Sequence, residues 1–166
     1  MPIDDSPSVP IERILDAWRR HQEILLYLLS EIPRGGLAAV PSGSRGRDVS
    51  RQLAHLHRVR LGWVYYHRTG KRPRLDRYTG PKGPNKSELK RLLTRSGREV
   101  ERFLAEALRG EAKVRMFGSD PVRFFSYLVA HESHHRGQIL LALKQNGMRL
   151  ADRVAVQGIW GAWFRR

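Results

Sequence analysis

The sequence predicts an all-α protein, a four-helix bundle with one long crossover connection and an apolar C-terminal tail packed on the bundle. Three observations support this fold class. Apolar residues recur at steps of three and four along four separate stretches, which is the period of an amphipathic helix. Capping residues, proline and glycine bound these stretches. The connection from Thr69 to Lys86 has no hydrophobic period, and its length favours a crossover over a tight turn between antiparallel neighbours.

The 166 residues are enough for one core, so we expect a single domain over residues 1–166, with residues 1–10 mobile. The first expected helix covers residues 11–32 and carries His21 on its apolar stripe, where a hydrogen-bonded core histidine is the simplest interpretation. The third covers residues 87–109 and is expected to be structural. Its inward positions are Leu89, Leu92, Leu93, Ser96, Val100, Phe103, Leu104 and Ala107.

The second expected helix begins near Asp48 or Ser50, because either residue can cap it, and it ends near residue 66. His57 and His67 fall outside its apolar stripe, so we expect both to face solvent. The stripe itself places one imidazole on the inner face of the helix. It consists of His55, Val59, Gly62 and Tyr66.

The fourth expected helix carries the most informative residues of the chain. Asp120 can cap its free amides, Pro121 fits the first helical position, and Gly147 supplies a left-handed stop. Its inward stripe follows steps of four and three and contains two histidines one turn apart. The stripe consists of Phe124, Leu128, His131, His135, Gln138 and Ala142.

The pair His131 and His135 predicts a metal site. Side chains at positions i and i+4 of a helix lie about 5–6 Å apart, so two imidazoles can reach one ion. Hydrogen-bonded core histidines are the alternative, but two imidazoles on an apolar stripe are costly unless something ligates them. His134 points about 100° around the helix from His135 and is not expected to be a ligand. His55 is the inward imidazole that a second helix can add.

Residues 131–135 read His-Glu-Ser-His-His and match the HExxH pattern of zinc peptidases, in which the glutamate is a general base. The metzincin extension would need a glycine at Gln138, and no β-rich segment precedes the helix, so peptidase activity is not expected. Glu132 is interpreted as a solvated carboxylate or as an acid beside the metal, and Gln138 as an amide that holds a ligand or bonds another helix. Both are candidate catalytic residues. Gly137 would let a neighbouring helix or a substrate come close.

Two segments resemble a known family. Residues 50–56, Ser-Arg-Gln-Leu-Ala-His-Leu, resemble the second-helix motif of the DinB/YfiT family of small metal-binding four-helix bundles. Residues 131–139, with Arg-Gly-Gln after the last histidine, resemble the fourth-helix signature of that family. The apolar close after Asn146-Gly147 is also similar, so the resemblance spans nearly the whole chain. The fourth-helix motif is fairly specific, whereas the second-helix match depends mostly on His55.

The resemblance implies a divalent metal cation held by His55, His131 and His135, with an open position for water or substrate. Zinc or nickel is the cofactor that we expect first, and iron, manganese or cobalt would also suit such a site. Characterised relatives in the family include transferases that use low-molecular-weight thiols, and thiol-dependent isomerases. The resemblance therefore implies a metal-dependent enzyme acting on a small-molecule substrate, of the thiol S-transferase or hydrolase type.

The net charge of +15 leaves a competing interpretation open. A strongly basic surface is typical of nucleic-acid binding, but the 31 basic residues are dispersed along the chain, with a local cluster only at residues 71–77. The alternative function is a non-enzymatic module, either a basic nucleic-acid-associated protein or a metal-binding stress protein.

The remaining expectations concern location and assembly. The absence of cysteine restricts any metal to histidine and carboxylate ligands. No leader or membrane span is recognisable, so we expect a cytoplasmic protein without a membrane partner. The tail at residues 154–164 is too apolar to be left in water, and we expect it to cover the bundle or to form part of a homodimer interface.

Overall fold

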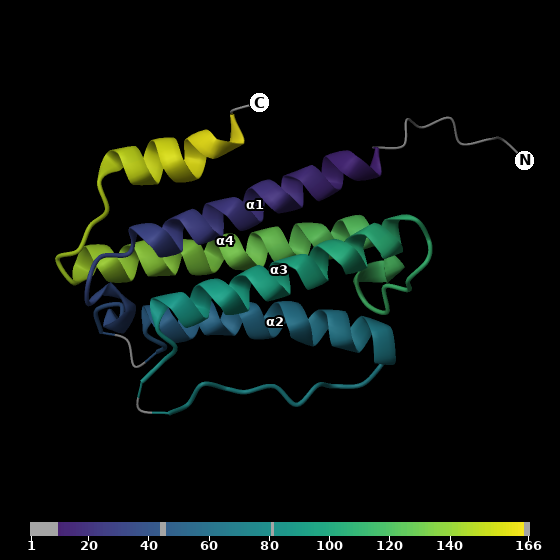
Figure 1. The fold of residues 1–166 in the computed structure, drawn as a ribbon, viewed down its shortest axis with the longest axis horizontal. Coiled ribbons are helices and arrows are strands. Elements are labelled where there is room, and N and C mark those ends of the chain that lie inside the picture. Colours follow the sequence, from purple (N-terminus) through teal and green to yellow (C-terminus); the bar gives the residue numbers. More distant parts are fainter. Residues whose placement is uncertain (1–9, 44–45, 81, 165–166) are drawn as a thin grey trace, which may run out of the picture.

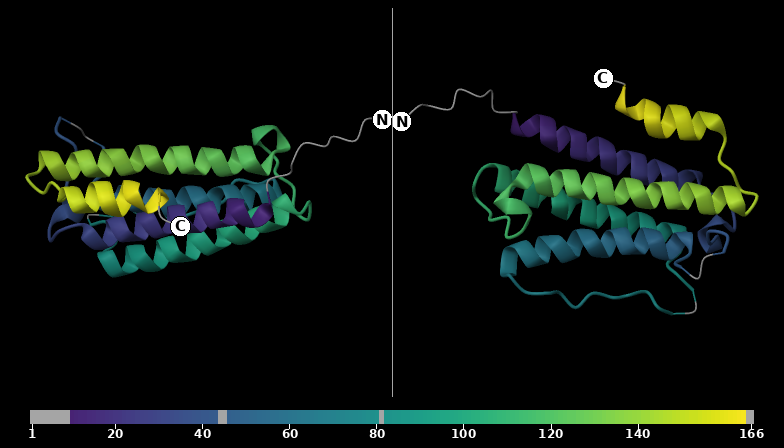
Figure 2. Two further views of the ribbon diagram at one scale, coloured as in Figure 1. Left: turned by 90° about the horizontal axis from the view of Figure 1, so that it is seen from above. Right: turned by 180° about the vertical axis from the view of Figure 1, so that it is seen from behind.

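The computed structural model describes residues 10–43, 46–80 and 82–164, and the segment expected to be mobile lies outside them except for Pro10. All regular secondary structure in the described residues is helical, so the all-α prediction is confirmed. The long helices of this part of the chain lie side by side (Figures 1 and 2). They are α1 (Ile11–Glu31), α2 (Val49–Thr69), α3 (Lys86–Leu108) and α4 (Pro121–Gln145), and the short ones are η1 (Gly36–Ala38), η2 (Phe117–Ser119), η3 (Arg153–Trp160) and η4 (Gly161–Trp163).

Side-chain caps fix where three of the long helices begin. The carboxylate of Asp48 accepts a hydrogen bond from the amide of Arg51 at 2.7 Å, so Asp48 rather than Ser50 caps α2. Asn85 accepts from the amide of Glu88 at 2.9 Å at the start of α3. Asp120 accepts from the amides of the first turn of α4, as the sequence predicts. The observed boundaries therefore follow the local capping chemistry.

The connection between α2 and α3 determines how these two helices are oriented. It leaves the C-terminal end of α2, runs back along that helix, and enters α3 at the end of the molecule where α2 begins (Figure 1). Ser50 is buried at this junction and its hydroxyl donates to the carbonyl oxygen of Pro84 at 2.6 Å. The connection therefore lies over the outer face of α2 and is held there at its far end.

The apolar core consists of two clusters at different levels along the helices. One is built around Leu25, Leu53 and Leu93, and the other around Trp18 and Phe103. Every inward position expected on α3, including the polar Ser96, is buried, because these residues follow one helical stripe. Burial of these side chains is the main favourable contribution to folding.

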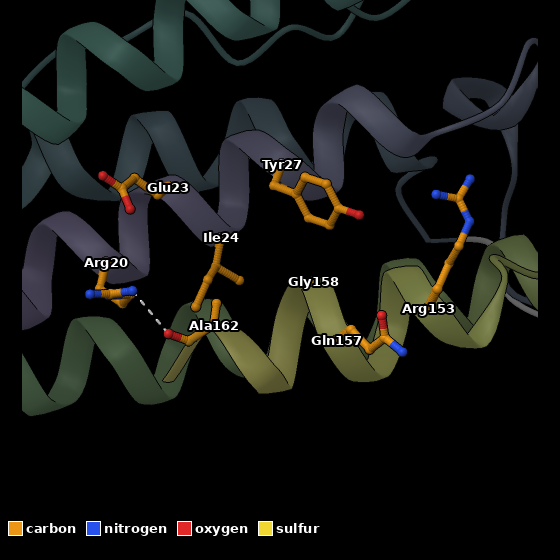
Figure 3. A pocket seen from close by; sticks show the side chains of 8 residues that line it. All are labelled: Arg20, Glu23, Ile24, Tyr27, Arg153, Gln157, Gly158 and Ala162. Carbon is orange, nitrogen blue, oxygen red and sulfur yellow. Dashed lines mark hydrogen bonds between the residues drawn. The ribbon is translucent and has the colours of Figure 1, made fainter. Parts of the chain in front are cut away.

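The apolar tail packs back against α1, as expected. In Figure 3 the segment containing Gly158 runs beside Tyr27, and Arg20 donates from Nη1 to the carbonyl oxygen of Ala162 at 3.1 Å. A Cβ atom at Gly158 would overlap the ring of Tyr27, so this glycine permits the close approach of the two segments. Large apolar side chains of the tail stay exposed, and they are Val156, Trp160, Trp163 and Phe164.

Among the described residues, none of the helices combines the length and the apolarity that crossing a membrane requires.

The prediction that His57 and His67 face solvent is wrong. Their side chains are 5% and 1% exposed, because the face of α2 that packs on α3 carries polar as well as apolar residues. The His67 ring stacks on that of Phe103 in α3, with centroids 5.3 Å apart and an interplanar angle of 10°. Its Nδ1 accepts from the amide of Arg115 at 3.1 Å. Burial lowers the pKa of His67 to about 4.

The lowered pKa of His67 predicts how stability depends on pH. In the unfolded chain His67 titrates near its ordinary value of about 6.5, so the unfolded state binds more protons between that pH and 4. Its contribution is complete above the unfolded pKa and is lost as pH falls towards 4. Because a tenfold change in proton affinity corresponds to roughly 1.4 kcal/mol, the substitution His67→Phe should remove roughly 3 kcal/mol of the acid-induced fall in the free energy of unfolding. Urea titrations at several pH values would measure it, and equal pH dependence in both proteins would contradict the account.

Candidate metal centre

Three histidines from two helices converge on one point. His55 of α2 meets His131 and His135 of α4, and one ring nitrogen from each lies within 4.8 Å of the others. The ring centroids of His55 lie 5.4 Å from His131 and 5.0 Å from His135, and those of His131 and His135 are 4.8 Å apart. The view from behind in Figure 2 shows α2 and α4 next to each other. These three residues are the metal ligands expected from the sequence, and the structure brings them together.

The histidine cluster contains nitrogen atoms that are free to bind a cation. The Nδ1 atoms of His55 and His131 are buried and have no hydrogen-bond partner in the described residues. Buried polar atoms are normally satisfied, and a cation bound in the cluster could satisfy these two nitrogens. Nδ1 of His135 lies 3.4 Å from Oε1 of Gln52, which favours a proton on Nδ1 and a free lone pair on the other nitrogen.

The surroundings of the cluster lower the pKa values of its three histidines. Burial and the positive charge of Arg47 lower the pKa of His55 to about 4, and burial and the neighbouring histidines lower the pKa of His135 to about 4. Burial lowers the pKa of His131 as well. Near neutral pH the rings are therefore uncharged, which leaves their lone pairs available to a metal without the release of protons.

A small pocket opens beside His135. It has a volume of about 400 Å³, and Gln52, Arg47 and Gln138 are among the residues that line it. Sequence reasoning missed Arg47, which lies in an irregular connection, and Gln52, which lies in the segment 50–56 but was given no role there. His135 is the member of the histidine cluster that lines this pocket.

The side chains of Gln138 and His134 form a hydrogen bond with each other on α4. Gln138 is half-buried, and its Nε2 donates to Nε2 of the exposed His134 at 2.9 Å, so its hydrogen bond stays within α4. His134 lies outside the metal-binding group. The expectation that Gly137 admits a neighbouring helix is wrong, since no atom would lie within 4 Å of a Cβ at this exposed position.

The interpretation of Glu132 as a solvated carboxylate is wrong. Its side chain is 1% exposed and lies in the core, where Arg60 donates from Nε to Oε1 and from Nη2 to Oε2, both at 2.6 Å. Nε2 of His21 lies 2.8 Å from Oε2. Although burial alone raises the pKa of Glu132, the charge of Arg60 and the hydrogen bonds lower it to about 2. The carboxylate is thus ionised and fully engaged.

The ion pair of Glu132 continues into a network that reaches all four long helices. Arg60 also donates from Nη1 to Oε1 of Gln22 at 2.5 Å and to the carbonyl oxygen of Leu93 at 3.2 Å. Its guanidinium lies over the ring of Trp18, 4.9 Å from the centroid. Nη1 of Arg136 lies 3.2 Å from Nδ1 of His21, so His21 accepts there and donates from Nε2 to Glu132. His21 is the satisfied core histidine that the sequence predicts.

The outer face of α3 carries a basic stripe that was not recognised in the sequence. Four exposed arginines follow one another at steps of four, three and four, and this helical spacing could have revealed the stripe in the sequence. Among them, Arg102 pairs with Glu99 at 3.3 Å. The nucleic-acid alternative would use this stripe, which consists of Arg91, Arg95, Arg98 and Arg102.

Comparison with known proteins identifies one family for most of the chain. The DinB family matches residues 8–153, a span that contains the four long helices and all three histidines of the cluster. A search of curated proteins finds no match.

The network predicts that Glu132 stabilises the fold. A carboxylate that served only as a catalytic base would not be expected to do so. In Glu132→Gln, Arg60 loses its ionic partner in the core, and breaking a buried pair costs about 3–5 kcal/mol of unfolding free energy. The matched control is Glu101→Gln, which removes a partly exposed pair with Arg19 and should cost less than about 1 kcal/mol. Urea denaturation followed by circular dichroism would measure both. Equal, small losses would contradict the structural role.

Proposed function

Because the chain belongs to the DinB family, we propose that it is a metal-dependent enzyme that binds a divalent cation through His55, His131 and His135 and acts on a small molecule. The reaction type that we propose is transfer to a low-molecular-weight thiol, or hydrolysis. The observation that supports the proposal best is the convergence of three uncharged nitrogen donors within 4.8 Å, two of them with buried and unpartnered ring nitrogens. Zinc or nickel is the proposed ion, because three imidazoles suit both.

The proposal extends to architecture and assembly. We propose a single domain of the four-helix-bundle type, in which the connection from α2 to α3 is the crossover. We also propose a homodimer, supported by the exposed Trp160 and Phe164 of the C-terminal segment, since large apolar side chains on a surface commonly mark an interface.

The residues around the cluster favour an anionic partner for the metal. Arg47 and Arg58 are the cations whose charge lowers the pKa of His55, and no carboxylate belongs to the described metal-binding group. A thiolate, a hydroxide or a carboxylate of a substrate would therefore be stabilised beside the histidines. When bound, a divalent metal lowers the pKa of a coordinated thiol or water, and three protein ligands leave a position open for it.

Gln52 and Gln138 are proposed to prepare the pocket beside His135. The contact of Gln52 Oε1 with Nδ1 of His135 fixes the orientation of that ring and directs its other nitrogen away from the amide. Gln138 lines the same pocket and would present a polar group to the substrate. Peptidase chemistry is not proposed, because both oxygens of Glu132 are bound to Arg60 and the carboxylate cannot serve as a free general base.

The proposed ligand set predicts the metal content of single variants. His135→Ala should lose the bound ion, because only two nitrogen donors remain, while His134→Ala should keep it, because that ring lies outside the group. Both proteins should stay helical, since the apolar core is unchanged. Elemental analysis of purified protein after dialysis against zinc or nickel would measure the content. Loss of metal from His134→Ala, or retention by His135→Ala, would overturn the assignment.

An open coordination position predicts a spectroscopic response to thiols. In protein loaded with cobalt, addition of cysteine should change the visible spectrum, because a thiolate would enter the coordination sphere. S-methylcysteine is the control, since it has nearly the same size and charge but cannot form a thiolate. Arg47→Gln should weaken the response, because a cation that acts on His55 is removed. A spectrum that ignores every thiol would indicate a closed structural site and contradict the enzyme proposal.

A further inference from the structure

A second pocket lies on the other side of the histidine cluster. It has a volume of about 510 Å³ and is formed by α2, the start of the connection to α3, the segment before α4, and α4 itself. Its lining is mainly aromatic and apolar, with Trp63, Tyr66, Met116 and Tyr127 contributing large side chains. We infer that this pocket binds a planar, mainly apolar small molecule that carries one negative charge. The inference rests on the proposed function and deepens it, because it assigns this pocket to the substrate of the proposed reaction.

The position of the pocket relative to the metal cluster supports this role. The ring of Tyr127 stacks on that of His131, with centroids 5.7 Å apart and an interplanar angle of 16°. Trp63 meets the same tyrosine edge-on, with centroids 5.8 Å apart. A ligand held against Tyr127 and Trp63 would therefore lie one aromatic ring away from a metal-binding residue. Contacts between aromatic rings add to the stabilisation that comes from the burial of area, which favours a planar ligand.

Gly62 supplies an independent observation about the use of this space. A glycine inside a helix is less favourable than alanine, so its presence there calls for a reason. At Gly62 a Cβ would meet only Leu75 and Pro73, both at 3.9 Å, so packing does not require glycine there. The contrast is Gly97 of α3, where a Cβ would lie 2.7 Å from Gln22. What Gly62 does is leave the wall of the pocket without a side chain.

The charge of the ligand follows from the charges around the pocket. Arg72 is the charged side chain among the residues that line it, and no acidic residue does so in the described structure. Arg72 is exposed and forms no ion pair with another described residue. An arginine at the rim of an aromatic pocket provides both a planar cation and hydrogen-bond donors for a carboxylate or sulfonate. The pocket at the C-terminal segment (Figure 3) differs, because Glu23 lies there together with Arg20 and Arg153.

The test uses anilinonaphthalene sulfonate, a planar aromatic anion, as the probe. Calorimetric titration of the full chain, with and without zinc, should show one bound molecule per chain. Gly62→Leu should weaken binding about tenfold or more, because the added side chain occupies the pocket. Gly137→Leu is the matched control: it makes the same change in α4, where nothing lies within 4 Å, and should leave the affinity unchanged. Gly62→Ala is the milder variant, which keeps the test valid if leucine disturbs the fold.

A neutral probe separates shape from charge. N-phenylnaphthylamine has the same ring system without the sulfonate, so Arg72→Gln should weaken binding of the anionic probe about fivefold and leave the neutral probe unaffected. Equal affinities in Gly62→Leu and Gly137→Leu would overturn the inference. So would loss of binding only in a variant with Trp160 and Phe164 replaced by serine, because the probe would then occupy the exposed tail. Probe binding that depends on Gly62 in a protein that takes up no metal would support the pocket and refute the proposed enzyme.

Discussion

The ion pair between Glu132 and Arg60 is the interaction on which the arrangement of the helices depends. Neither side chain is more than 1% exposed, and a charge in that position is tolerated only while its partner and its hydrogen bonds are all present. The partners come from different helices, and they include His21 and Gln22 of α1 and the carbonyl oxygen of Leu93 of α3. Movement of any one helix would therefore leave part of a charge uncompensated in the core.

The side chains of one short segment of α4 lie in two different surroundings. Glu132 turns into the centre of the molecule, while the residues on either side of it, His131 and His135, turn towards His55 of α2. The HExxH pattern is thus shared with zinc peptidases, but in this chain its glutamate joins the helices in the core and its histidines belong to the proposed metal site. The spacing of residues in a sequence motif determines which of them share a helix face. The neighbouring helices determine the surroundings of each face and therefore its role.

How much the sequence could predict differs from helix to helix. On α3 the stripe is apolar except for Ser96, and every expected inward residue is buried. On α4 the expected stripe through His131 and Gln138 is displaced, because Glu132 and Arg136 occupy the core and their partners are many residues distant in sequence. The three-histidine group was predictable, since helical spacing and a family resemblance pointed to the same residues. Arg47 and Arg72, which line the two pockets, were not, because they lie in connections whose course no periodicity describes.

The level of the ion pair in the core has a consequence for helix register. It lies between the two apolar clusters, so sliding α4 along α2 by one turn would bring Arg136 or Leu128 opposite Arg60 in place of Glu132. The first error sets two like charges against each other, and the second leaves a guanidinium against a hydrocarbon. Both errors are electrostatically unfavourable, so the ion pair favours the observed register of the helices. The same alignment brings the three imidazoles to one level, so the proposed metal site depends on an ion pair that contains none of its ligands.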